Sequence, residues 1–179
     1  MTINVFKQAS AIGMRRAIVL APILWLAGCA GPRSPGTGSR AGGAGLRKIV
    51  VSPQQRGEVV LTAMGLLESQ YNYGGSHPVT GFDCSGLVAY VFQNAVQESL
   101  PHNTAEIARL STPISRKHLK AGDFVFFNTL GRPFSHMGIY IGDNQFVNAP
   151  SSGGRVRVDS LLNPYFAKRF ESARTLFAS

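Results

Sequence analysis

The 179-residue chain contains only two cysteines, Cys29 and Cys84. A framework of several disulfides is therefore excluded, because two cysteines can form only one bond within a chain. Charged residues are also scarce, at 15% of the sequence, and all nine acidic residues lie at or beyond Glu58. No block of Lys and Arg is interleaved with aromatic residues, so we do not expect nucleic-acid binding.

The formal net charge is +9, but it is unevenly placed. Lys7, Arg15 and Arg16 precede every acidic residue, so the rest of the chain is less basic than the total implies. A mildly basic surface suits an anionic polymer or a membrane surface, and it serves ordinary solubility equally well. The apolar content of 44% is enough for a hydrophobic core, and the length predicts one domain with an extra terminal segment.

The apolar run at residues 17–27, AIVLAPILWLA, is too short to span a bilayer, which takes about 20 residues. After Arg15 and Arg16 it fits a signal peptide. It ends in LAGC (26–29), which resembles the bacterial lipobox, in which the cysteine is acylated and becomes the mature N-terminus. We predict a signal peptide over residues 1–28 and a lipid anchor at Cys29, which would hold the protein stably on a membrane. The alternative is a plain secretory signal with an incidental cysteine.

Residues 30–46 are rich in Gly, Pro and Ser and lack large side chains. We interpret residues 29–46 as the acylated cysteine with a flexible tether, and residues 47–179 as the folded domain. If Cys29 is acylated, Cys84 has no disulfide partner within the chain. An unpaired thiol in an exported protein is a candidate reactive group.

The first part of this domain has the pattern of helices. SPQQ at 52–55 predicts a helix start, with Ser52 as cap and Gln55 completing a capping box, and this helix should end before Gly74. Asp83 is a suitable cap for a second helix that begins near Cys84. Asn103 is the expected cap of a third, shorter helix.

The second part has the pattern of strands. Segments rich in Val, Ile, Phe and Tyr are typical of strands, and GDNQ at 142–145 predicts a tight turn between two of them. The predicted strands cover residues 123–128, 136–142, 145–149 and 155–161. Helices followed by hairpin-linked strands predict an α+β fold with an antiparallel sheet.

Cys84 could be a buried apolar residue, half of a disulfide, a metal ligand or a nucleophile. A free thiol has a pKa near ~8.5, and a helix N-terminus lowers it. The expected place of Cys84 in the first turn after Asp83 therefore favours a reactive thiolate, and the backbone N–H groups there could hold an oxyanion. No C-x-x-C or H-x-x-x-H spacing occurs, so we predict no metal site and no cofactor.

A nucleophilic cysteine needs a base, and the base needs an orienting group. Among the four histidines, His136 begins an apolar strand, which would hold it rigidly at the edge of a cleft. In a hairpin that turns at 143–144, the neighbours of His136 lie near residues 150–151. Asn148 is therefore close to His136 by direct or diagonal pairing, and its amide oxygen could accept a hydrogen bond from the imidazole.

Several motifs then occur in one order: YNYGG (71–75), FDCSGLV (82–88), LPHNTAE (100–106), AGDFVFF (121–127) and SHMGIYIGDNQFVNAPSSGGRV (135–156). In that order and spacing, the sequence closely resembles the NlpC-type family of bacterial cell-wall cysteine peptidases, over roughly residues 50–165. The resemblance implies a papain-like fold, with N-terminal helices packed on an antiparallel β-sheet.

The resemblance also implies the roles of single residues. Cys84 would be the nucleophile and His136 the base. The third polar position, most often histidine in the family, falls on Asn148, which resembles the orienting asparagine of papain-like proteases. Tyr71 would lie near the oxyanion site.

Two residues beside the nucleophile would line the peptide-binding cleft, namely Asp83 and Ser85. The family's usual L-P-R-T reads L-P-H-N here, which would place His102 at the rim of the cleft.

The implied reaction is hydrolysis of an amide bond in peptidoglycan stem peptides, next to diaminopimelate, through a thioester on Cys84. The bond would be γ-D-glutamyl–diaminopimelate or D-alanyl–diaminopimelate. Ala30, in place of aspartate after the lipobox cysteine, resembles outer-membrane lipoproteins that face the periplasm. Two alternatives remain open: a non-catalytic wall-binding lipoprotein, and an acyl or amide transferase that uses the same Cys–His site.

Overall fold

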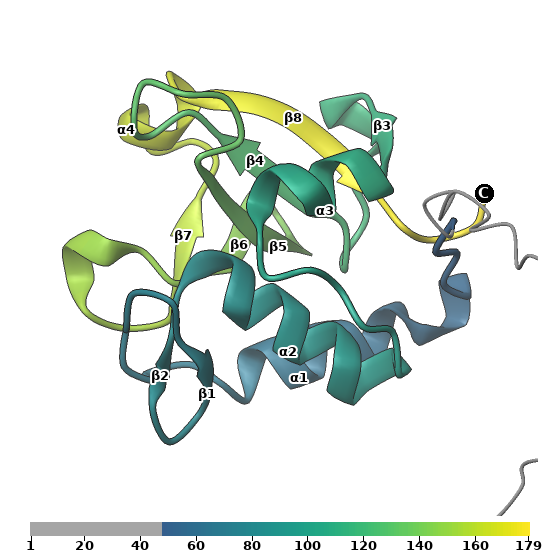
Figure 1. Ribbon diagram of the computed structural model, residues 1–179. Coiled ribbons are helices and arrows are strands. Elements are labelled where there is room, and N and C mark those ends of the chain that lie inside the picture. The colour runs from purple at the N-terminus through teal and green to yellow at the C-terminus, as the bar shows by residue number, and fades with distance from the viewer. Residues whose placement is uncertain (1–47) are drawn as a thin grey trace, which may run out of the picture. The chain divides into compact units, whose positions relative to one another are not determined.

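The computed structural model describes residues 48–179 (Figure 1). The predicted signal peptide, Cys29 and the tether lie outside these residues. Within residues 48–179, no helix is long and apolar enough to cross a membrane.

Helices occupy the first half of the described chain and one short segment near its end. Three further short segments of the described residues, Pro53–Gln55, Arg116–His118 and Ser151–Gly153, form 3-10 turns. The α-helices of the described residues are α1 (Arg56–Met64), α2 (Cys84–Val96), α3 (Thr104–Leu110) and α4 (Pro164–Ala167).

The main sheet has six strands in the order β3-β8-β4-β5-β6-β7, and every neighbouring pair is antiparallel. A separate pair, β1 (Ser76–His77) and β2 (Gly81–Phe82), precedes α2. The predicted α+β class with an antiparallel sheet is confirmed. The strands of the main sheet are β3 (Thr112–Ile114), β4 (Phe124–Phe127), β5 (His136–Gly142), β6 (Gln145–Asn148), β7 (Arg157–Ser160) and β8 (Phe170–Thr175).

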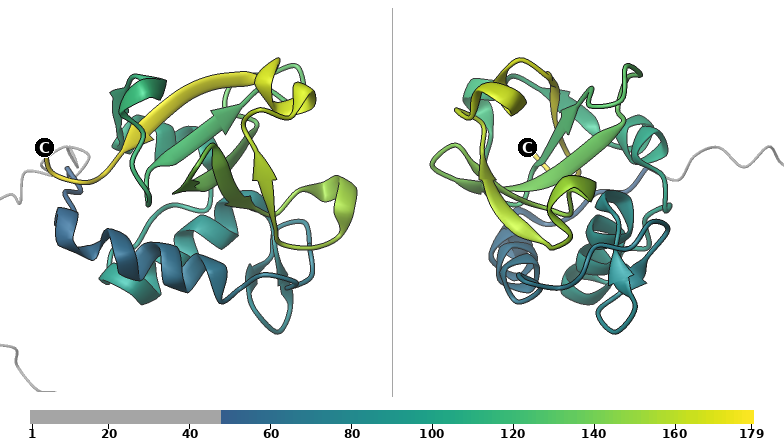
Figure 2. Two further views of the ribbon diagram at one scale, coloured as in Figure 1. Left: turned by 180° about the vertical axis from the view of Figure 1, so that it is seen from behind. Right: turned by 90° about the vertical axis from the view of Figure 1, so that its left-hand side faces the viewer.

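Both faces of the central strand β4 are buried. Phe124 and Phe126 belong to the larger core, which α1, α2 and α3 close from one side of the sheet. Val125 and Phe127 point the other way and pack with Phe166 of α4. Figures 1 and 2 show α1 and α2 side by side below the sheet and α4 at its far end. Because side chains alternate along a strand, the apolar run of β4 contributes to the hydrophobic cores on both faces of the sheet.

The first helix differs from the expectation. The difference is at its start, where Ser52 makes no capping bond with its side chain and residues 53–55 form a 3-10 turn. Its end at Met64 lies before Gly74, as predicted. The chain leaves the helix because its backbone pairs with a distant segment. The Glu68 N–H donates to the Val156 carbonyl at 3.0 Å, and the Val156 N–H donates to the Ser69 carbonyl at 2.8 Å.

The caps of the next two helices lie where the sequence predicts them. The Asp83 carboxylate accepts a hydrogen bond from the Gly86 N–H at 2.7 Å. The Asn103 side chain accepts one from the Glu106 N–H at 3.0 Å. These caps fix where α2 and α3 begin, and the start of α2 carries Cys84.

The loop at residues 72–75 packs against the start of α2 where Gly75 meets Gly86. The Gly75 carbonyl accepts a hydrogen bond from the Asp83 N–H at 2.9 Å. A Cβ on Gly86 would lie 2.0 Å from that same carbonyl oxygen, a distance that no side chain tolerates. The YNYGG and DCSG motifs therefore belong to one packed unit around Cys84.

Candidate active site

A cleft of about 360 Å³ lies between the start of α2 and the start of β5. The loops around residues 71–74, 102–104, 129–135 and 149–151 close its sides. We call it the Cys84 cleft. It contains both members of the predicted catalytic pair and four other residues singled out from the sequence: Tyr71, Asp83, Cys84, Ser85, His102 and His136.

The Cys84 thiol is half-buried at the first position of α2. Backbone N–H groups of Met137, Ser85 and Cys84 itself lie near the sulfur and act to lower the pKa of the thiol. Met137 is the residue after His136 on β5, so the helix start packs directly beside the strand that carries the histidine. Donors directed at the sulfur favour its thiolate form.

The pKa of the Cys84 thiol is nevertheless raised, to about 11, and the main cause is burial. The negative charge of Asp83 adds to the rise, while the three backbone N–H groups oppose it. The expectation of a lowered pKa is therefore wrong for the unliganded protein. The first reason is burial of the sulfur, and the second is that the helix cap beside it is a carboxylate, whose charge opposes the positive helix end.

The Asp83 carboxylate organises this side of the cleft. One oxygen, Oδ1, accepts hydrogen bonds from the Gly86 N–H, from the Ser85 hydroxyl at 3.1 Å and from His102 Nε2 at 2.8 Å. The other oxygen accepts one from the Gly74 N–H at 3.1 Å. The expected position of His102 at the cleft therefore has a structural basis, because it bonds directly to the cap residue.

Replacing Asp83 with asparagine tests this account of the thiol. Asparagine keeps an oxygen for the Gly86 N–H and removes the negative charge, so the pKa of Cys84 should fall below about 11. When the rate of alkylation by iodoacetamide is plotted against pH, its midpoint should therefore lie at lower pH in Asp83→Asn than in the wild type. Glu58→Gln, which removes an exposed carboxylate at the start of α1, is the matched control. An unchanged midpoint in Asp83→Asn would contradict the role given to the carboxylate.

His136 begins β5, and Asn148 ends the neighbouring strand β6. The register pairs Ile139 with Val147, so Asn148 lies diagonally from His136. The His136 Nε2 to Asn148 Oδ1 distance is 3.0 Å. Gly138 makes room for this contact, because a Cβ there would lie 3.2 Å from the Asn148 Cβ and 2.7 Å from the Val147 carbonyl oxygen.

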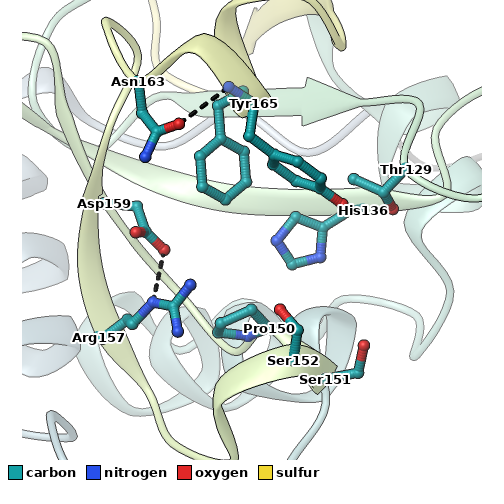
Figure 3. A pocket seen from close by; sticks show the side chains of 10 residues that line it. Thr129, His136, Pro150, Ser151, Ser152, Arg157, Asp159, Asn163 and Tyr165 are labelled. Carbon is teal, nitrogen blue, oxygen red and sulfur yellow. Dashed lines mark hydrogen bonds and ion pairs between the residues drawn. The ribbon is translucent and has the colours of Figure 1, made fainter.

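Asp159 on β7 accepts a hydrogen bond from the Asn148 amide nitrogen, on the side of the amide that faces away from His136. The Asn148 Nδ2 donates to Asp159 Oδ2 at 2.9 Å. Arg157 Nε donates to the same oxygen at 2.9 Å, as Figure 3 shows. A carboxylate only accepts hydrogen bonds, so the amide nitrogen must face Asp159 and the amide oxygen must face His136. The proton of the imidazole therefore lies on Nε2, which leaves Nδ1 as the acceptor.

His136 is a neutral base in this environment. Its side chain lies against the rings of Phe127 and Phe166, with centroid distances of 6.1 and 6.3 Å, and the residue is 7% exposed. Burial lowers the pKa of His136, whereas the Asn148 hydrogen bond and the charge of Asp159 raise it. At neutral pH the cleft thus holds an uncharged imidazole beside a thiol.

The remaining predicted residues also line the Cys84 cleft. Tyr71 is close enough to Cys84 and Asp83 for their charges to raise the pKa of its phenol, although burial is the larger cause. Ser85 is buried against Asp83. Within residues 48–179, no three His, Cys, Asp or Glu side chains gather in a way that could hold a metal ion.

Two residues of the site were not singled out from the sequence, Asp159 and Arg157. Both lie on a strand that the sequence predicts, and the register that pairs Asn148 with Arg157 places Asp159 two residues along the same strand. These two residues could be found only from the pairing of β6 with β7, and no local sequence motif reveals that pairing.

A cysteine at a helix start, with a histidine oriented by a side-chain amide, is the arrangement of papain-like thiol enzymes. Comparison with known families agrees with this class. Residues 68–175 match the NlpC/P60 family, and the chain belongs to that family.

Individual relatives extend the comparison. The chain is 41% identical over 107 residues to the murein DD-endopeptidase MepH of Escherichia coli K12, which covers 58% of this chain and 40% of MepH. It is 33% identical over 172 residues to the probable endopeptidase NlpC of the same strain, covering 91% of this chain and all of that protein. Among solved structures, the NlpC/p60 domain of the peptidoglycan hydrolase SagA aligns with a TM-score of 0.59 at 31% identity, covering 67% of this chain and 97% of that domain. The chain spans 40 to 56% of the length of the first curated relatives it matches.

Proposed function

We propose that this protein is a cell-wall endopeptidase that hydrolyses amide bonds in peptidoglycan stem peptides. The observation that carries the proposal is the meeting of Cys84 and His136 in one cleft, with His136 oriented by Asn148. The names of MepH and SagA, a murein endopeptidase and a peptidoglycan hydrolase, support the substrate class.

The reaction follows from the protonation states in the cleft. His136 Nδ1 takes the thiol proton as the Cys84 sulfur attacks the substrate carbonyl. The oxyanion that forms lies by the helix start, where backbone N–H groups and the Tyr71 hydroxyl are the available donors. The imidazolium then gives its proton to the leaving amine, and a thioester remains. Water, deprotonated by His136, hydrolyses the thioester and regenerates the thiol.

The expected substrates carry diaminopimelate on the amine side of the bond. Both bonds named from the family resemblance, γ-D-glutamyl–diaminopimelate and D-alanyl–diaminopimelate, have this property. Asp83 and Ser85 lie on the Cys84 side of the cleft, which is the side that receives the acyl half.

Product analysis tests the proposed function. Purified protein is incubated with muropeptide monomers and cross-linked dimers, and the products are identified by mass spectrometry, with iodoacetamide-treated protein as control. Each cut should add one water to the substrate mass, with activity lost after alkylation. No product, or equal activity after alkylation, would contradict it. Products that carry an added amine would identify a transferase instead.

We further propose that the protein is an outer-membrane lipoprotein anchored through Cys29. The support is the LAGC sequence after an apolar run, with Ala30 at the next position. The full chain should partition with membranes and incorporate labelled fatty acid when expressed in a Gram-negative host. Cys29→Ser should remove the label, and a label that persists in this variant would contradict the anchor.

A further inference from the structure

A second pocket, of about 200 Å³, lies next to the Cys84 cleft. The two share Thr129, His136 and Ser151, so His136 lies on the boundary between them. Cys84 does not line this second pocket. The pocket extends toward β7 and the start of α4 (Figure 3). We call it the Arg157 pocket.

The chemistry of the Arg157 pocket is set by one cation. Arg157 Nε donates to Asp159 Oδ2, which fixes the plane of the guanidinium. Its two terminal nitrogens make no hydrogen bond to any residue from 48 to 179, and the side chain is 39% exposed. Figure 3 shows the guanidinium facing the pocket between Asp159 and Pro150. A guanidinium fork with both terminal nitrogens available matches a carboxylate.

The position beside His136 identifies which half of a substrate would enter. In the proposed reaction the acyl group bonds to Cys84, while the leaving amine takes its proton from His136. The amine half must therefore lie on the His136 side, where the Arg157 pocket is. Asn163 and the Ser151–Ser152 turn also line the pocket and offer polar groups to such a ligand.

We propose that the Arg157 pocket binds the leaving-amine half of the substrate through a free carboxylate on that half. This inference rests on the proposed function and adds a specificity to it. Diaminopimelate carries two amines and two carboxyl groups, so either expected bond releases an amine whose residue can retain a carboxylate. A carboxamide at that position has no charge and cannot make the same paired contact with Arg157.

The test compares two muropeptides that differ only in this group, one with the free carboxylate and one with the carboxamide. The wild type should prefer the carboxylate roughly 10- to 100-fold in kcat/KM, the range expected for hydrogen bonds between charged groups. Arg157→Gln should bring the ratio near one, and Arg157→Lys should retain part of it. The ratio is the readout, because any common effect on the catalytic groups cancels.

Arg155→Gln is the matched control. Arg155 also lies in the segment after the Ser151–Gly153 turn, but it bonds to the Glu68 carbonyl and does not line the pocket, so the preference should remain. A wild type that cuts both substrates equally, or an Arg157→Gln variant that keeps the preference, would overturn the proposal. If the wild type cuts neither substrate, the proposed function itself fails, which is a different result.

Discussion

Replacing Cys84 with alanine should lower kcat/KM for muropeptide cleavage by about 10⁴- to 10⁶-fold, the range seen when a nucleophile is removed from a preorganised site. The reason is that water would then have to attack the amide directly, with no thioester to divide the reaction into two easier steps. Alanine keeps the helix start intact, because the Asp83 carboxylate still caps the Gly86 N–H. Turnover is measured by liquid chromatography of the released muropeptides.

The same variant separates the enzyme from a wall-binding protein. Cys84→Ala should bind muropeptides about as tightly as the wild type, since Tyr71, Asp83 and Ser85 remain in the cleft. Matching melting temperatures serve as the control for folding. Cleavage by Cys84→Ala at the wild-type rate would exclude the thioester mechanism, and binding without turnover by the wild type would favour the scaffold alternative.

Local sequence signals placed the parts of the fold that have strong caps and turns. Asp83 and Asn103 are short polar side chains immediately before apolar helical patterns, and both cap their helices. The turn at Asp143 and Asn144, which both adopt positive φ, joins β5 to β6 and sets the register between them. Because the turn sets that register, the sequence alone predicts that His136 and Asn148 lie close together.

The sequence does not predict strand β8, although this strand pairs with both β3 and β4. Its sequence, FESART, mixes charged and small residues and has no run of β-branched or aromatic side chains. Strand formation depends on the neighbours against which a segment packs. Here β8 continues the sheet from β4, whose four buried residues supply that surface.

The sequence predicts a lowered pKa for the Cys84 thiol, whereas burial and the charge of Asp83 raise it. The sequence places Cys84 at a helix N-terminus, which by itself favours the thiolate. It also places the acidic cap next to the sulfur, and it gives no measure of how deeply β5 buries that sulfur. Burial and the Asp83 charge outweigh the backbone donors, so proton removal falls to His136 during attack.

His136 can take that proton only if its Nδ1 is unprotonated. Asp159 keeps it so by orienting the Asn148 amide, whose oxygen accepts a hydrogen bond from the protonated Nε2. Replacing Asp159 with asparagine should lower kcat roughly 10- to 10³-fold with little change in KM. The new amide can donate as well as accept, so the Asn148 amide can turn and present its nitrogen to His136. The imidazole proton would then move to Nδ1, the tautomer that cannot accept from the thiol. A wrong tautomer of this kind is costly in the related Ser–His–Asp sites, at about 10⁴-fold.

A pH profile distinguishes this positioning role from simple loss of structure. The charge of Asp159 raises the pKa of His136, and that of Arg157 lowers it. Without the carboxylate, the pKa of His136 should fall further, so the acid limb of kcat/KM should move to lower pH. A variant that is merely less stable would lose activity without moving that limb.

Asp143→Asn provides the matched control for Asp159→Asn. Asp143 is an exposed carboxylate at the β5–β6 turn with φ of 48°, a conformation that asparagine also adopts readily. This variant should keep the wild-type rate and the wild-type pH profile. If Asp159→Asn matched it in both respects, Asn148 would hold its orientation without the carboxylate, and the tautomer of His136 would have to be set by the strand geometry alone.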